Sequence, residues 1–250
     1  MTVERITSRK NPFVQHLRSL ESDSAWRKEK REYLCDGHKL LEEALDKGAG
    51  IRCVVWKDTP GTVPFTDEVR QLVLPAELFD YVSPMKNSPG PLFTVRMPDE
   101  PEPVFSCAVL LENVQDPGNV GTVIRTAAAL GVDTVLLCGA CADVYSPKAV
   151  RATMGAVFRE KLIHCTVDEA RAYADKNRLP LYGAALSARA EDIRGIDLKK
   201  AVVAVGSEGQ GLSGELLAKC DGEIIIPMTP GSESLNAAVA ASIILWEMGR

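Results

Sequence analysis

The sequence predicts an α/β protein built from two domains, and three observations support this. Strand-like apolar runs alternate with helical patterns along most of the 250 residues, as expected of sheets covered by helices. The stretch 97–103 is acidic and proline-rich and lacks apolar periodicity, which is typical of a linker. Polar or glycine-rich loops follow several strand-like runs of the second half, where α/β domains bind ligands. We therefore expect one domain at 1–96 and another at 104–250.

The first expected domain is a small α/β unit. Apolar residues recur at helical spacing in 12–20 and 38–47, which predicts two amphipathic helices. Short runs rich in β-branched, aromatic and other apolar residues predict strands. These runs are 33–35, 52–56, 71–74 and 92–95.

The second expected domain alternates more regularly. Its strand-like runs are 107–111, 134–137, 161–164, 181–184, 201–205 and 223–226. Helical patterns fall between and after them at 119–130, 147–158, 168–176, 213–220 and 235–248. Repeated strand–helix units predict a parallel sheet with helices on both faces.

The composition is that of a globular protein, with 46% hydrophobic and 25% charged residues. The net charge of −5 gives no overall nucleic-acid signature. Residues 1–40, however, hold nine Lys and Arg against six Asp and Glu, with a basic cluster at 27–31. Two interpretations stay open: a surface that contacts RNA phosphates, or a solvated helix whose basic residues pair with Glu29 and Glu32.

No apolar run approaches the roughly 20 residues of a membrane span, and no apolar segment follows the N-terminal charges as in a signal peptide. The seven cysteines are an odd and scattered set, which suggests reduced thiols and a cytoplasmic protein. Cys138 and Cys141 have redox or zinc spacing. Because no second pair or placed histidine follows, and because the pair closes a strand-like run, we expect structural thiols and no metal site.

The glycine-rich loop Gly206–Gly211 follows an apolar run. Its spacing is Gly-x-x-Gly-x-Gly, which is neither a phosphate-binding Walker loop nor the dinucleotide-binding pattern. Glycines allow a close approach of the main chain to a ligand and positive φ angles. A tight turn capped by Ser213 is the alternative, but a turn has no need of the carboxylate of Glu208.

Two further polar loops stand near strand or helix ends. A β-branched run stops at Pro227, so free main-chain groups between Ile226 and Met228 suit an adenine ring, although an ordinary strand end is an equal alternative. Ser234 or Asn236 precedes a helix rich in small residues and could simply cap it.

The segment 116–121 also has the features of a turn and a helix cap. Arg125 lies six residues after Asn119, among apolar residues of an expected helix. A buried arginine is costly unless it is paired, so Arg125 is a candidate functional residue.

Together these segments resemble the SpoU (TrmH-type) 2′-O-ribose RNA methyltransferases of the SPOUT class. The resemblance covers nearly the whole chain, and the order and spacing of its motifs make it specific. The first family motif stands here as Asn119, Gly121 and Arg125. The second motif, Gly-x-Glu-Gly-x-Gly, stands as Gly206, Glu208, Gly209 and Gly211. The third motif is Ile-Pro-Met followed by Ser-Leu-Asn, which stand at 226–228 and 234–236. The first hundred residues are similar to the family's ribosomal-protein-L30e-like RNA-binding domain.

The resemblance implies a deep trefoil knot near the C-terminus, which ordinary connection rules discourage. It also implies a homodimer with its sites at the subunit interface, and S-adenosylmethionine bound in the knot in a bent conformation. By family position, the cofactor-binding residues are Gly206, Gly211, Ile226, Met228 and Leu235.

The resemblance also assigns the activation of the ribose 2′-oxygen to Arg125. Methyl transfer from a sulfonium needs alignment and a more nucleophilic oxygen but no metal, because the leaving thioether is neutral. A guanidinium is a poor proton acceptor, so we expect Arg125 to stabilise the developing alkoxide. The residues expected to orient Arg125 and the ribose are Asn119, Glu208, Ser234 and Asn236.

Two other classes of protein stay open. One is a catalytically silent RNA-binding or ribosome-assembly protein with the same fold, which the intact motifs argue against. The other is a sister SPOUT enzyme that methylates a guanine base, which would need a different N-terminal architecture. Among RNA substrates, ribosomal RNA is favoured over transfer RNA because the L30e-like domain more often accompanies ribosomal substrates.

Overall fold

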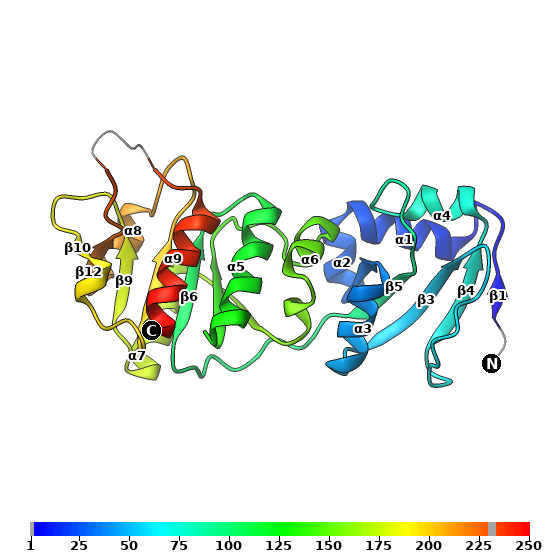
Figure 1. The fold of residues 1–250 in the computed structure, drawn as a ribbon, viewed down its shortest axis with the longest axis horizontal. Coiled ribbons are helices and arrows are strands. Elements are labelled where there is room, and N and C mark those ends of the chain that lie inside the picture. Colours follow the sequence, from blue (N-terminus) through cyan, green and yellow to red (C-terminus); the bar gives the residue numbers. More distant parts are fainter. Residues whose placement is uncertain (1–2, 230–233) are drawn as a thin grey trace. The chain divides into compact units, whose positions relative to one another are not determined.

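A computed structural model describes residues 3–229 and 234–250. The chain forms two compact units (Figure 1). One contains the chain up to Asp99 together with Asp143–Phe158, and the other contains Glu100–Ala142 and Arg159–Arg250. A segment expected in the second domain therefore groups by its contacts with the first unit.

The first unit is built on a five-stranded sheet in the order β1-β4-β3-β5-β2. β5 pairs antiparallel with both β2 and β3, whereas β4 pairs parallel with β3 and β1. Its main apolar core includes residues of α1 and α4, among them the fully buried Leu17 and Phe79. The strands are β1 Glu4–Arg5, β2 Glu32–Asp36, β3 Ile51–Lys57, β4 Arg70–Leu74 and β5 Leu92–Arg96, and the helices α1 Pro12–Ser22, α2 Ser24–Lys30, α3 His38–Asp46 and α4 Ala76–Val82.

The helix predicted at 147–158 is broken. The chain forms α6 (Pro147–Thr153) and a 3₁₀ turn, η1 (Ala156–Phe158). Between them Met154 and Gly155 take left-handed conformations, with φ of 49° and 92°, which end a right-handed helix. α6 packs against β2 within the first unit.

Arg27 is a buried structural residue of this unit. Only 4% of it is exposed, and its Nε and Nη2 donate hydrogen bonds of 2.9 and 2.7 Å to Oδ2 of Asp143. Its Nη1 donates to the Leu20 carbonyl at 2.6 Å. A guanidinium with these partners is not available to a phosphate, so the expected phosphate-contacting cluster at 27–31 does not include Arg27.

The second unit contains the predicted parallel sheet. Its seven strands run in the order β10-β12-β9-β11-β6-β7-β8, and all the pairings in this sheet are parallel. The strands are β6 Ala108–Glu112, β7 Thr134–Cys138, β8 Lys161–Cys165, β9 Leu181–Ala184, β10 Glu191–Asp192, β11 Val202–Val205 and β12 Gly222–Ile225. The helices are α5 Pro117–Leu130, α7 Val167–Asn177, α8 Gly214–Leu217 and α9 Ala237–Gly249, with a 3₁₀ turn η2 at Ile193–Gly195.

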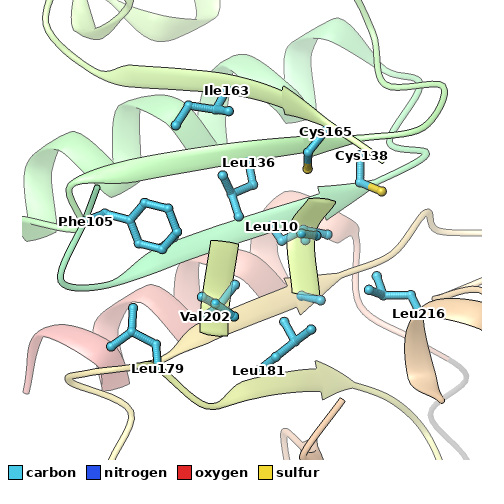
Figure 2. Packing of buried hydrophobic residues seen from close by; sticks show 14 of the residues in the cluster. Phe105, Leu110, Leu136, Cys138, Ile163, Cys165, Leu179, Leu181, Val202 and Leu216 are labelled. Atoms are coloured by element: carbon cyan, nitrogen blue, oxygen red, sulfur yellow. The ribbon is translucent and has the colours of Figure 1, made fainter. Parts of the chain in front are cut away.

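Helices cover both faces of this sheet. α5 and α9 pack side by side (Figure 1), with α9 also on β11 and α5 on β7. An apolar cluster with residues of α7 and α8 includes Leu110, Leu136 and Val202 from the central strands (Figure 2). Side chains alternate along a strand, so Glu112 lies on the same face as Leu110.

The seven cysteines are free thiols. Cys138 ends β7, and its pKa is lowered by a hydrogen bond with Cys165, whose own pKa is raised by that bond and by burial. The two cysteines are register partners on β7 and β8 (Figure 2). The Cys141 thiol donates to the Leu111 carbonyl at 3.2 Å. Within 3–229 and 234–250, no group of three His, Cys, Asp or Glu side chains is placed to hold a metal ion, and no helix is long and apolar enough to cross a bilayer.

Glu160 precedes β8 at its amino end. Burial raises the pKa of Glu160 to about 7, the Asp133 charge adds to this, and Arg159 opposes it. Its Oε2 is buried with no hydrogen-bond partner among the described residues. Because the folded-state pKa lies above the ordinary 4.5, the folded protein binds more protons between these two values. The free energy of unfolding therefore falls as pH rises through that window.

Glu160→Gln should relieve this cost. We expect the variant to melt at a higher temperature than the wild type at about pH 8, where the carboxyl is ionised, and at nearly the same temperature at about pH 4.5. Thermal melts followed by circular dichroism at both pH values test this. A difference in melting temperature that is the same at both would show that ionisation of Glu160 has no part in it.

Candidate active site

The loop Gly206–Gly211 is a closed turn at the carboxyl end of β11. The Gly211 N–H donates to the Ser207 carbonyl at 2.9 Å, and the two residues form an isolated β-bridge. A Cβ on Gly206 would lie 2.1 Å from the Gly211 carbonyl carbon, and Gly211 has a φ of 66°. Both positions therefore require glycine, for a close main-chain approach and a left-handed conformation respectively.

A cavity of about 690 Å³ opens beside this loop. This size suits a small-molecule cofactor. Its lining combines the glycine-rich loop, the segment after β12 and apolar residues, which fits a nucleoside. Glu208 and Ser234 line the cavity. So do all five residues expected to bind the cofactor, which are Gly206, Gly211, Ile226, Met228 and Leu235.

Three expected catalytic residues meet at one point, although they come from three separate segments: the first turn of α5, the loop after β11 and the N-cap of α9. Asn119 Nδ2 donates a hydrogen bond to Glu208 Oε1. Asn236 Nδ2 lies 3.3 Å from both Glu208 Oε1 and Asn119 Oδ1. The carboxylate thus accepts from two amides and serves as the centre of the cluster.

The capping interpretation of Asn236 is also correct. Its Oδ1 accepts from the N–H groups of Ala238 and Val239 at 3.0 and 3.2 Å, at the start of α9. The side-chain oxygen therefore caps the helix, while the side-chain nitrogen is directed to the Glu208 cluster. The helix start consequently fixes the orientation of the amide.

Arg125 lies apart from this cluster. It sits six residues beyond Asn119 on α5, about 9 Å along the helix axis, and its side chain is exposed. Among residues 3–229 and 234–250 it has no ion-pair or hydrogen-bond partner. The premise that Arg125 is buried in its helix was therefore wrong, because the side chain is exposed. Thr122 and Ala129 are exposed at i−3 and i+4 on α5, so Arg125 belongs to the outer face of the helix.

The structure adds site residues that the sequence did not indicate. The loop after β9 lines the same cavity, with Ser187 and Arg189, and so does Glu223 of β12. The Glu223 side chain is 7% exposed, accepts a hydrogen bond from Ser187 Oγ and pairs with Arg189 at 2.6 Å. The loop follows a strand-like run at its carboxyl end, which is the signal that could have identified it.

A second, shallow depression adjoins the Glu208 cluster, between α5 and α9. Asn119 and Asn236 line it together with apolar residues of α9. Two of these are large and exposed: Val239 at 48% and Trp246 at 60%. Exposed apolar side chains beside functional residues are typical of an interaction surface.

Comparison with known proteins identifies the class. The sequence profile of the SpoU rRNA methylase family matches residues 106–246, more than half of the chain. The chain therefore belongs to the SpoU rRNA methylase family. It is an RNA methyltransferase whose methyl donor is S-adenosylmethionine, as the family resemblance implied.

Particular relatives match over nearly the full length. The chain is 31% identical over 252 residues to the 23S rRNA (guanosine(2553)-2′-O)-methyltransferase RlmP of Bacillus subtilis, covering 98% of this chain and 99% of that protein. It is similar to the AdoMet-bound rRNA methyltransferase of Sinorhizobium meliloti, with a TM-score of 0.87, 28% identity and coverage of 98% and 97% of the two chains. The SpoU methyltransferase AviRb of Streptomyces viridochromogenes in complex with AdoMet gives a TM-score of 0.87, with 26% identity and coverage of 96% and 97%.

Replacing Gly206 tests the cofactor loop. Gly206→Ala places a methyl group against the Gly211 main chain, so the loop must open and S-adenosylmethionine affinity should fall at least about tenfold. Isothermal titration calorimetry measures the affinity. Gly214→Ala is the matched control, because its Cβ meets nothing within 4 Å. Equal cofactor affinity in the two variants would contradict this role of the loop. Gly209 is less suitable than Gly206, because a Cβ there also meets nothing within 4 Å.

Proposed function

We propose that this protein transfers the methyl group of S-adenosylmethionine to a ribose 2′-hydroxyl of RNA, and that its substrate is ribosomal RNA in the cytoplasm. The observation that carries the proposal is the convergence of Asn119, Glu208 and Asn236 at the edge of the cofactor-sized cavity. The similarity to RlmP, a 2′-O-methyltransferase of 23S rRNA, supports the choice of ribose and of ribosomal RNA.

The cofactor supplies an activated methyl group, so the residues of the chain must align it and stabilise charge on the acceptor oxygen. The guanidinium of Arg125 stabilises the 2′-alkoxide as it develops and holds an RNA phosphate. Asn119 and Asn236 orient the ribose, with Glu208 fixing both amides, and Ser234 assists at the cavity wall. The main chain at Gly206, Ile226 and Leu235 holds the adenosine and methionine portions, while Gly211 and Met228 line the pocket.

The site is completed by a second copy of the chain in this proposal. Arg125 and Glu208 are exposed in a single chain, yet electrostatic stabilisation is strongest where water is excluded. The depression between α5 and α9, with Val239 and Trp246, provides the apolar surface for such a homodimer. We also propose the family's trefoil knot in the segment that carries β11 and β12. The insertion of β11 between β6 and β9 supports a complex path there.

The domain at 1–96 binds RNA in this proposal and has the family's L30e-like fold. Its mixed sheet covered by helices supports this. Arg9, Lys10 and Lys28 are exposed and serve as phosphate contacts. Lys30 pairs with Glu29, as the solvated-helix interpretation expected, whereas Arg31 pairs with Asp99 and Glu32 lies 3.2 Å from His16.

Arg125→Ala tests the catalytic assignment. Because the side chain is exposed, the variant should fold with an unchanged melting temperature and bind S-adenosylmethionine normally. The single-turnover methylation rate should fall at least about 100-fold, the scale of losing one charge-stabilising donor. Arg125→Lys should not restore the rate, because an ammonium lacks the planar fork of donors. A folded alanine variant with wild-type turnover would exclude this mechanism.

The RNA-binding surface can be tested by its salt dependence. Replacing Arg9, Lys10 and Lys28 by alanine should weaken binding to an unmodified 23S rRNA transcript and reduce the slope of log affinity against log salt by about 2. A double replacement of the exposed Lys199 and Lys200 is the control. Filter binding over a salt series measures both. The same slope in wild type and triple variant would place RNA binding elsewhere.

The substrate itself requires mapping. Comparing 2′-O-methylated positions in ribosomal and transfer RNA between a deletion strain and its parent should reveal one missing position in ribosomal RNA. A missing position in transfer RNA would assign the enzyme to that substrate. No missing position, together with no binding of S-adenosylmethionine in calorimetry, would favour the catalytically silent RNA-binding protein.

A further inference from the structure

Glu112, the last residue of β6, is a buried carboxylate outside the catalytic set. It is 2% exposed and both oxygens accept hydrogen bonds from one residue. The Ser213 N–H donates to Oε2 at 2.7 Å, and Ser213 Oγ donates to Oε1 at 2.6 Å. It lies on the sheet face whose core includes Leu212 and Leu216, so its surroundings are largely apolar.

A carboxylate in this position is costly, which indicates a specific use. Burying a charge without a charged partner is unfavourable unless hydrogen bonds compensate for the lost hydration. In the described parts of the chain, no Lys, Arg or His forms an ion pair with Glu112. Helix α8 does not need it either, because Ser213 Oγ already accepts from the Leu216 N–H at 3.1 Å and so caps the helix.

What Glu112 does achieve is a connection between two separate segments of the site. Ser213 follows Gly211, the end of the cofactor loop, by two residues. Glu112 itself opens the segment that leads to Asn119. Glu208 of the cofactor loop accepts a hydrogen bond from Asn119, at the end of this segment. Ser213, just after the loop, donates two hydrogen bonds to Glu112, at the start of the same segment. The loop is therefore held near its middle, at Glu208, and just beyond its carboxyl end, at Ser213, against one strand–helix connection.

We propose that Glu112 is a positioning residue that holds the cofactor loop at a fixed distance from Asn119, so that the methyl donor and the acceptor hydroxyl are aligned. This proposal rests on the proposed methyl transfer. Asn119 and Glu208 alone form an exposed contact near the middle of the loop, which thermal motion can open. The buried bonds from Ser213 to Glu112 restrict the loop where water does not compete. Alignment of the reacting groups is sensitive to small displacements.

Glu112→Gln in the full-length protein tests this. The amide nitrogen cannot accept a hydrogen bond, so one of the two bonds from Ser213 is lost with little change in volume. S-adenosylhomocysteine affinity, measured by calorimetry, should fall about tenfold. The single-turnover rate at saturating cofactor should fall further, by about a hundredfold, because alignment is lost in the bound state as well.

Glu160→Gln is the matched control, because it changes a half-buried carboxylate next to the amino end of a strand of the same sheet, away from the cofactor loop. It should leave both the affinity and the rate unchanged. Ser213→Thr keeps both donors and should behave as wild type, while Ser213→Ala loses the Oγ donor and should show an intermediate loss. A merely structural role of Glu112 would lower the melting temperature without changing either quantity in the folded protein.

Each outcome is decisive. Wild-type affinity and saturated rate in folded Glu112→Gln would overturn the proposal. If that variant does not fold, Ser213→Ala takes its place: an intermediate loss supports the positioning role, and wild-type values overturn it. Failure of the unaltered protein to bind S-adenosylhomocysteine would count against the proposed function itself, which separates that failure from an error about Glu112.

Discussion

The pairing of β11 between β6 and β9 is the constraint on which the site depends. Parallel strands end at the same edge of a sheet, so this pairing brings the loop after β11 beside the loop after β6, although about ninety residues separate them in the chain. Val205, the last residue of β11, is the register partner of Leu111, the last residue but one of β6. A functional segment follows each strand: Gly206–Gly211 after β11, and the turn into α5 after β6.

Around this edge, one carboxylate organises two amides. Glu208 accepts from Asn119 and Asn236, so each amide oxygen is left to accept from the main chain, from the other amide or from a substrate hydroxyl. The hydrogen bonds from Ser213 to Glu112 attach the residues just after the same loop to the end of β6. Main-chain geometry matters as much as side-chain chemistry here, because Gly206 and Gly211 bring the loop closer to itself than any side chain would allow.

The charge distribution of the first unit also depends on folding. In sequence, residues 27–31 are one basic cluster. In the structure, Arg27 is buried by its bonds to Asp143, while Lys28 remains exposed. Asp143 lies more than a hundred residues further along the chain, in a segment that groups with this unit. A count of basic residues therefore overstates the number that can contact a phosphate.

The sequence by itself determined the fold class, the family, the cofactor and five of the residues that line the cavity, because strand–helix periodicity and short-range motifs are local properties. It also predicted the strands of four or more residues and left open a helix at the basic residues 27–31, while it missed the short helix α4, whose pattern extends over too few residues to show a period. Only the tertiary structure decided that Arg125 is exposed, that Arg27 is buried, that the helix at 147–158 breaks at Met154, that Glu223 lines the cavity and that Glu112 bonds to Ser213. The positions of Arg27, Glu112 and Glu223 depend on partners distant in sequence, and the helix break depends on left-handed backbone conformations. Neither leaves a periodic signal in the order of the residues.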